Sequence, residues 1–245
     1  MARWGRYSGF PAYVPVAERK ERAAKAVAKL AKKKGFVPAP VIIEPKSKTI
    51  ASTAWGKAWC TNLESYSDYE NRLPRGRTYV RNGSVVDLQI SAGRVTARVS
   101  GTSLYTVEID IVATPAAHWK RLQKSCAGQI DSLVELLRGT ISSAIMNVMT
   151  SRESGLFPAP SHIAMDCSCP DGATMCKHVA AALYGVGARL DHNPELLFTL
   201  RRVDPTDLIA SAATKAGPNA KKKKPRAAKA MDSAEMADVF GIDLE

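Results

Sequence analysis

The twelve residues from Cys167 to His178, CSCPDGATMCKH, contain three of the five cysteines and one of the four histidines of the chain. Their spacing is C-x-C-x6-C-x-H, and three thiolates with one imidazole are a standard ligand set for a tetrahedral structural zinc ion. Cys167 and Cys169 share one face if they lie on a strand, because alternate strand residues point to the same side. Cys176 and His178 stand at the start of the helix that follows. The stretch therefore predicts one structural Zn²⁺ held by Cys167, Cys169, Cys176 and His178.

Other kinds of chemistry fit this pattern less well. A disulfide between Cys167 and Cys169 would be strained by its short ring, and the C-x-x-C redox motif is absent. A catalytic zinc needs an open coordination position, which four protein ligands do not leave. The deaminase signature H-x-E is missing, and we find no nucleophile with a base, no phosphate-cradling loop and no close carboxylate pair at a motif spacing. We therefore expect a protein that is not an enzyme and has no small-molecule substrate.

The sequence of residues 77–112 changes to a period of two, which is the period of strands. Turn signals at residues 82–83, 92–93 and 101–102 divide this run into four segments. Four antiparallel strands in a meander are predicted, with one apolar face and one face that carries arginines.

Helices are predicted on both sides of this run. Thr114 and Pro115 signal a helix start, and apolar residues at helical spacing from Trp119 to Leu137 predict a helix that ends at Gly139 and covers the apolar face of the sheet. The other predicted helices span residues 17–34, 54–66 and 141–149 and follow Cys176, Asn193-Pro194 and Asp204-Pro205. The predicted fold class is α+β: a four-stranded antiparallel meander covered by helices, then a small zinc-stabilised hairpin-helix module, then a helical C-terminal part.

Changes of composition along the chain indicate five parts. They are a basic N-terminal loop and helix (1–35), an α+β domain with the antiparallel sheet (36–155), the zinc module with its following helices (156–213), a disordered basic linker (214–231) and an acidic-apolar C-terminal peptide (232–245).

The net charge of +12 is concentrated on the flanks of the chain. Residues 1–35 carry ten Lys/Arg against two acids, and residues 214–231 carry seven Lys/Arg, whereas residues 36–213 carry a net charge of only +2. Basic flanks suit phosphate binding through counterion release. Solvated basic tails without a binding role are the alternative that the composition leaves open.

A cluster of basic side chains on the predicted sheet suggests a nucleic-acid contact surface. Arg77, Tyr79 and Arg81 would share one strand face, and arginine pairs with phosphate while tyrosine stacks on bases. The alternative is a solvated sheet face whose arginines pair with Asp87 and neighbouring acids. The candidate nucleic-acid residues are Arg72, Arg75, Arg77, Tyr79, Arg81 and Arg98, with Lys221, Lys222, Lys223, Lys224 and Arg226 in the basic linker.

The cysteine pattern, followed by the apolar stretch VAAALYGVG, resembles the SWIM-type zinc finger. Residues 54–90 and 166–191 also resemble bacterial stand-alone SWIM zinc finger proteins, and the likeness extends over roughly residues 1–210. The resemblance implies zinc-ligand roles for the four residues of the cluster. It also implies a role in DNA or protein binding beside a Swi/Snf-type helicase.

Two functions follow from these observations. The first is a zinc-stabilised, non-catalytic accessory protein that binds nucleic acid, DNA rather than RNA, together with a Swi/Snf-type helicase. The second is a protein-protein adaptor that recruits the helicase, for instance through residues 232–245, without touching nucleic acid itself.

The expected location is the cytoplasm, including the nucleoid. No apolar run approaches the ~18 residues needed to cross a bilayer, so no membrane partner is expected. The odd number of cysteines, with Cys60 and Cys126 expected as buried thiols, fits a reducing compartment.

Overall fold

The computed structural model describes residues 14–32, 35–44, 47–66, 71–130 and 132–209, all of which belong to one compact unit. The expected linker 214–231, with its candidate residues Lys221 to Lys224 and Arg226, and the expected peptide 232–245 lie outside the described residues. Within the described part of the chain, every helix falls short of the length and hydrophobicity that a bilayer span requires.

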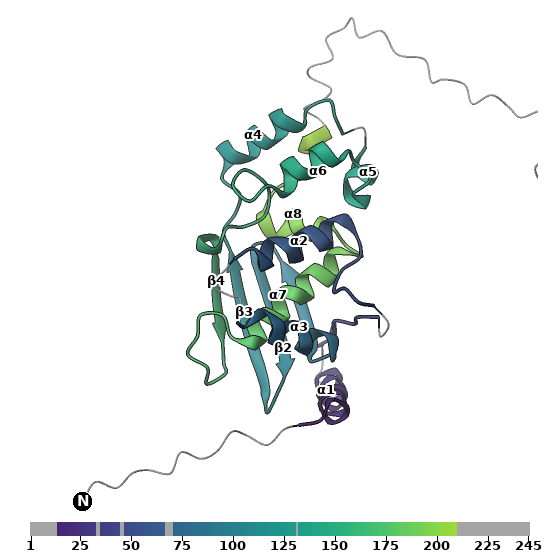
Figure 1. Cartoon of the computed structure of the whole chain (residues 1–245), viewed down its shortest axis with the longest axis vertical. Coiled ribbons are helices and arrows are strands. Elements are labelled where there is room, and N and C mark those ends of the chain that lie inside the picture. The colour runs from purple at the N-terminus through teal and green to yellow at the C-terminus, as the bar shows by residue number, and fades with distance from the viewer. Residues whose placement is uncertain (1–13, 33–34, 45–46, 67–70, 131, 210–245) are drawn as a thin grey trace, which may run out of the picture. The chain divides into compact units, whose positions relative to one another are not determined.

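Four antiparallel strands form one sheet in the order β1-β2-β3-β4, and helices pack around it, so the predicted α+β class is confirmed (Figure 1). In β2, Val95, Ala97 and Val99 are buried and alternate with more exposed residues, which is the predicted pattern. The strands are β1 Val85–Ser91, β2 Arg94–Ser100, β3 Leu104–Ile111 and β4 Ile163–Cys167.

The prediction of a strand at residues 77–81 is wrong, because residues Leu73–Arg81 form helix α3. Its buried residues are Leu73, Gly76 and Val80, and spacings of three and four residues place them on one face of a helix. The fourth strand of the sheet is instead β4, the strand that leads into the cysteine cluster. β4 pairs with β3, with Cys167 opposite Val107. Residues beyond 156 therefore complete the sheet.

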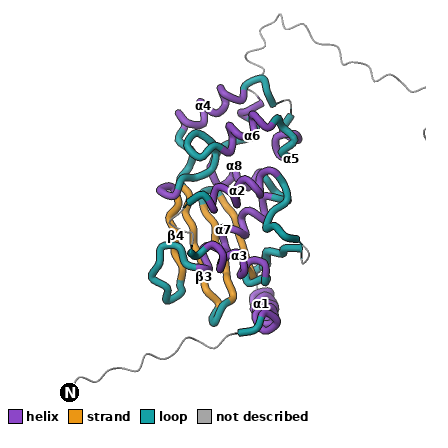
Figure 2. The backbone as a smooth tube through the Cα atoms, viewed as in Figure 1, coloured by secondary structure: helices purple, strands orange, loops and turns teal. Residues whose placement is uncertain are grey.

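Helix α7, Lys177–Leu190, covers the apolar face of the sheet. All of its residues from His178 to Leu190 are buried except Arg189, and the helix packs against the strands on one side and against α2 and α3 on the other (Figure 2). A helix that is apolar all round must be buried on all sides, and the space between sheet and helices provides this environment.

The helix that was predicted to cover the sheet takes a different place. Residues 114–138 form two helices, α4 Ala116–Cys126 and α5 Leu133–Arg138, separated by a turn in which Gly128 has a φ of 75°. Both lie with α6, Ser143–Thr150, beyond one end of the sheet (Figure 1). The prediction of a single covering helix is therefore wrong. α4 buries only a stripe of side chains, whereas α7 is apolar on every face and takes the position on the sheet.

The predicted helices on the N-terminal side are confirmed. α1, Val16–Ala31, has the expected thin apolar stripe: its buried residues Ala23 and Leu30 form a small cluster with Val86 of β1. Val86 follows Val85, which belongs to the main core, so α1 packs on the opposite face of the sheet from α7.

The tryptophans of α2, Ala54–Glu64, pack in the core as expected. The indole N–H of Trp55 donates to the Leu136 carbonyl at 2.8 Å, and that of Trp59 donates to the Leu183 carbonyl at 2.9 Å. These bonds satisfy the one polar group of each buried ring. The remaining elements are α8 Glu195–Arg201 and the short 3-10 turn Pro160–His162.

Gly76 allows α3 and α7 to approach each other closely. A Cβ at residue 76 would lie 2.4 Å from the Cβ of Ala180 and 2.8 Å from the Ala180 carbonyl carbon. Since backbone atoms are involved, no side-chain rotation relieves this contact, and one helix would have to move.

We predict that Gly76→Ala destabilises the protein. Helix propensity favours alanine by about 1 kcal/mol, but overpacking against backbone atoms outweighs it, and a net loss of about 1–3 kcal/mol is expected in denaturant unfolding. Gly172→Ala is the control, because a Cβ there meets nothing within 4 Å. Equal unfolding free energies for the two variants would contradict the close approach of α3 and α7.

Candidate metal centre

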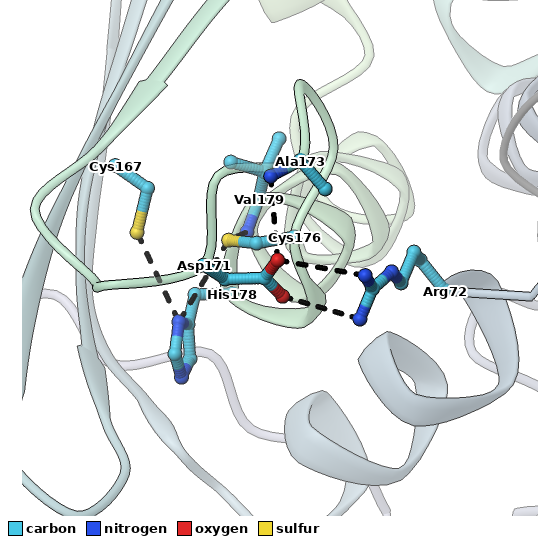
Figure 3. A network of polar contacts seen from close by, with 7 residues as sticks. All are labelled: Arg72, Cys167, Asp171, Ala173, Cys176, His178 and Val179. Atoms are coloured by element: carbon cyan, nitrogen blue, oxygen red, sulfur yellow. Dashed lines mark hydrogen bonds and ion pairs between the residues drawn. The ribbon is translucent and has the colours of Figure 1, made fainter. Parts of the chain in front are cut away.

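Four potential ligand atoms meet where β4 ends and α7 begins. Figure 3 shows Cys167, Cys176 and His178 of this group. The three Sγ atoms and one ring nitrogen of Cys167, Cys169, Cys176 and His178 all lie within 4.8 Å of one another. The Nδ1 atom of His178 is 3.8 Å from the Cys167 Sγ and 3.7 Å from the Cys176 Sγ. The four residues predicted from the sequence are therefore close enough to hold one metal ion.

These distances match the geometry that such a ligand set requires. In a tetrahedral site with Zn–S near ~2.3 Å and Zn–N near ~2.0–2.1 Å, a sulfur and a nitrogen ligand lie about 3.6 Å apart. The separations of Nδ1 from the two sulfurs are close to this value. The donor set is sulfur-rich, which favours zinc over hard cations such as Mg²⁺ or Ca²⁺.

The sheet positions the first two cysteines. Ser168, which lies between them, continues the pairing of β4 with β3: its N–H donates to the Thr106 carbonyl at 3.0 Å, and its hydroxyl accepts from the Thr106 N–H at 3.0 Å. β4 ends at Cys167 and the chain bends at Ser168, and the sulfurs of Cys167 and Cys169 both lie in the candidate metal centre.

Cys176 is the N-cap residue of α7, and its Sγ accepts a hydrogen bond from the Val179 N–H at 3.5 Å. The first N–H groups of a helix have no partner within the helix, and they favour a negative charge at this position. A thiolate at Cys176 is thus stabilised by α7, which is the arrangement that a metal ligand needs.

His178 is held between two tyrosine rings and is only 2% exposed. The Tyr105 ring stacks on the imidazole at 4.3 Å, and the Tyr79 ring meets it edge-on at 5.4 Å. Burial, with the nearby charge of Lys177, lowers the pKa of His178 to about 4. The imidazole is therefore neutral at ordinary pH, and Nδ1 offers a lone pair toward the sulfurs while the buried Nε2 finds no hydrogen-bond partner among the described residues.

Burial also shifts the pKa values of the cysteine thiols. It raises the pKa of Cys167 and of Cys176 above the ordinary value, because a buried thiolate loses its hydration. Several thiolates within this space need a cation beside them, and a bound metal ion supplies it while protons leave. The thiols outside the cluster have no such partner: burial raises the pKa of Cys60 to about 12 and of Cys126 to about 11, so both stay protonated.

The loop between Cys169 and Cys176 is attached to α3 through an ion pair. The Asp171 carboxylate accepts from both terminal nitrogens of Arg72, at 3.1 and 3.4 Å, and its Oδ1 also accepts from the Ala173 N–H at 3.3 Å (Figure 3). Arg72, predicted to contact nucleic acid, thus holds the loop of the metal centre in place.

The other predicted arginines also make contacts within the protein. The guanidinium of Arg77 pairs with Glu64 and donates to the Tyr184 hydroxyl at 3.3 Å. Arg81 donates to the Lys48 carbonyl, and Arg98 lies over the Phe36 ring at 5.5 Å. They do not form one strand face, because α3 is a helix.

The sequence left open that the arginines of the sheet pair with acids of the protein itself, and this holds only in part. Arg94 pairs with Glu108 and Asp110 on the neighbouring strand. Asp87, expected to pair with arginine, is buried and accepts instead from the Ala39 N–H at 3.0 Å and from the Gln89 amide at 2.8 Å.

Arg75 and Tyr79 have a different environment, in a pocket that also includes Thr78, Lys177 and Arg19 of α1. Sequence reasoning missed Lys177 and Arg19. Lys177 could have been found from the sequence, because it stands between two of the candidate metal ligands. Arg19 had none beyond its place in a basic helix, because its contact with α3 depends on tertiary packing.

No family model matches the chain. An uncharacterized protein of Mycobacterium tuberculosis is 35% identical over 167 residues, which is 67% of this chain and 60% of that protein. The chain thus spans about 60% of the length of the curated relative it matches. No solved structure matches. The likeness to SWIM-type zinc fingers stays a prediction from the motif.

We predict that Zn²⁺ binding to the metal-free chain at pH 7 releases close to three protons. Thiols titrate well above this pH and must lose their protons to bind, whereas the His178 imidazole, with a pKa of about 4, is already neutral. The buffer dependence of the calorimetric binding enthalpy measures this number. A fourth proton appearing between about pH 7 and pH 6, near the ordinary histidine pKa, would contradict the buried, neutral His178.

Proposed function

We propose that the protein is a zinc-stabilised, non-catalytic accessory protein that binds nucleic acid. The zinc part of the proposal rests on the sulfur-rich ligand set at Cys167, Cys169, Cys176 and His178 and on the spacing of its atoms. Four protein ligands leave no position for a catalytic water, which supports a structural role for the ion. The C-x-C-x6-C-x-H pattern followed by the buried helix α7 supports a SWIM-type module.

The zinc would act on the stability of the whole unit rather than on a separate finger. Its ligands connect β4, which is part of the sheet, with the start of α7, which covers the sheet. Loss of the ion would leave buried thiols and a buried imidazole without their partner at this junction.

Cys176→Ser should lower the zinc content from one ion per chain to a small fraction. Unfolding free energy should fall by about 4 kcal/mol or more, in the range that accompanies loss of a metal site. Cys60→Ala removes a thiol outside the centre and should keep both quantities. Metal analysis with denaturant unfolding measures them, and a chelator should reproduce the loss of stability in the unchanged chain. Full zinc content in Cys176→Ser would contradict the proposed ligand set.

The nucleic-acid part of the proposal is carried by one observation: basic residues of three helices line one pocket next to the candidate ligands Cys176 and His178. Arg19 of α1, Arg75 of α3 and Lys177 of α7 line the same pocket. Lys20, Lys29 and Lys32 on or next to α1 are exposed and make no ion pair among the described residues. A surface with excess positive charge from several elements suits a polyanion.

The finer parts of the proposal come from the resemblance to bacterial SWIM zinc finger proteins. They are association with a Swi/Snf-type helicase, a preference for DNA over RNA, and a cytoplasmic location including the nucleoid. The second candidate is an adaptor that recruits the helicase through residues 232–245. Deletion of 232–245 should then abolish co-purification of the helicase, while nucleic-acid binding by the isolated protein would be absent.

Binding to a labelled 20-nucleotide strand and to a duplex should weaken steeply with salt. With about five phosphate contacts, affinity should fall about 100-fold or more between about 50 and 200 mM salt. Fluorescence anisotropy measures the dissociation constants, and the same strand as RNA provides the comparison. Affinity that is independent of salt, or no binding at about 50 mM salt, would contradict the proposal and favour the adaptor.

A further inference from the structure

The pocket beside the metal centre brings together positive side chains from three helices. It has a volume of about 280 Å³ and is lined by Arg19, Arg75, Thr78, Tyr79 and Lys177. No acidic residue is among these lining residues. Like charges that lie close together repel one another, and an anion bound among them lowers the free energy of this arrangement.

Arg75 and Lys177 are available for such an anion. Neither makes an ion pair among the described residues, in contrast to Arg72 and Arg77, which are paired with Asp171 and Glu64. The Lys177 ammonium lies 5.8 Å from the centre of the Tyr79 ring. This contact holds the Lys177 side chain over the Tyr79 ring, which lines the pocket.

Arg19 and Thr78 also line the pocket, and each makes a hydrogen bond to a nearby carbonyl. The Nε of Arg19 donates to the Val14 carbonyl at 2.9 Å, which fixes the guanidinium on α1. The Thr78 hydroxyl donates to the Pro74 carbonyl at 3.0 Å. The cationic groups, rather than a hydroxyl, must therefore hold the ligand.

A phosphate group is the anion that fits this arrangement. Arginine binds phosphate through parallel N–H donors, and lysine adds a point charge. The volume of about 280 Å³ is near the lower end of the ~300–1,000 Å³ of drug-sized ligand sites, so the pocket has room for a phosphate group and part of the molecule that carries it. α7 begins beside it, and the N-terminus of a helix favours an anion as well.

Two of the residues that line this pocket, Tyr79 and Lys177, also adjoin the candidate metal centre. Lys177 stands between the ligands Cys176 and His178, and Tyr79 rests with its ring against the imidazole of His178. Two of the lining residues are thus positioned by the same structure that positions the metal ligands.

We propose that Arg75, Lys177 and Arg19 form a binding pocket for a phosphate group. The inference deepens the proposed function and rests on it in one respect, namely that the phosphate belongs to a nucleic-acid backbone. The same chemistry would bind a small phosphorylated compound, so the experiment has an arm for each source.

The test compares two double variants of the full chain that lose the same charges. Arg75→Gln with Lys177→Gln removes an arginine and a lysine from the pocket. Arg121→Gln with Lys124→Gln removes an arginine and a lysine from exposed positions on α4, at the other end of the molecule from α1 (Figure 1). Zinc content and unfolding midpoint establish that both variants are folded.

The pocket variant should bind a labelled 20-nucleotide oligothymidylate about tenfold or more weakly at about 0.1 M salt, and the slope of log K against log salt should decrease in magnitude by about 1.4. The α4 variant should bind within about twofold of the unchanged chain, because charges beyond the Debye length are screened. Titration of the same three proteins with inorganic pyrophosphate tests whether the pocket binds a small phosphorylated compound.

Each outcome decides the inference. Loss of oligonucleotide binding in the pocket variant alone supports it. Pyrophosphate binding that the pocket variant loses, with no oligonucleotide binding by any chain, supports the pocket and overturns the proposed nucleic-acid function. If both double variants lose the same oligonucleotide affinity, or if neither loses any, the pocket is overturned while the proposed function stands. Absence of binding to both anions overturns both.

Discussion

Helix α7 has no polar face, since Arg189 alone escapes burial between His178 and Leu190. Such a helix needs apolar partners on every side, and it obtains them from the sheet beneath it and from α2 and α3 above it. Gly76 permits the contact with α3, because any side chain there would meet the backbone of Ala180. The arrangement of the sheet, of α3 and of the metal centre therefore depends on how α7 is packed.

The metal centre lies at the first turn of this buried helix, where polar groups are most costly to bury. Cys176 caps α7, and His178 lies within it between two tyrosine rings. The ligands from the other side, Cys167 and Cys169, belong to or follow the edge strand β4. A bound metal ion would connect the sheet directly to the helix that covers it, so metal binding and folding of the unit should be coupled.

Residue spacing was sufficient to predict which four side chains meet at the candidate metal centre, the α+β class, most helices and the strands β1, β2 and β3. It failed at residues 73–81, where Thr78, Tyr79 and Val80 have strand propensity and Gly76 weakens a helix. Contact with α7 overrides both preferences, because a helix buries Leu73, Gly76 and Val80 together. It failed again at residues 114–138, since amphipathic spacing indicates that a helix packs on something but does not identify its partner.

The sequence by itself determined the candidate metal ligands, because a strand, a turn and a helix start within twelve residues bring these four side chains together. It also determined that most excess charge lies on the flanks. Only the tertiary structure decided which basic residues are paired with acids. Arg72 and Arg77 are paired with acids distant in the sequence, whereas Arg75 and Lys177 converge on one pocket. Such contacts between remote segments are set by packing, and spacing along the chain does not encode them.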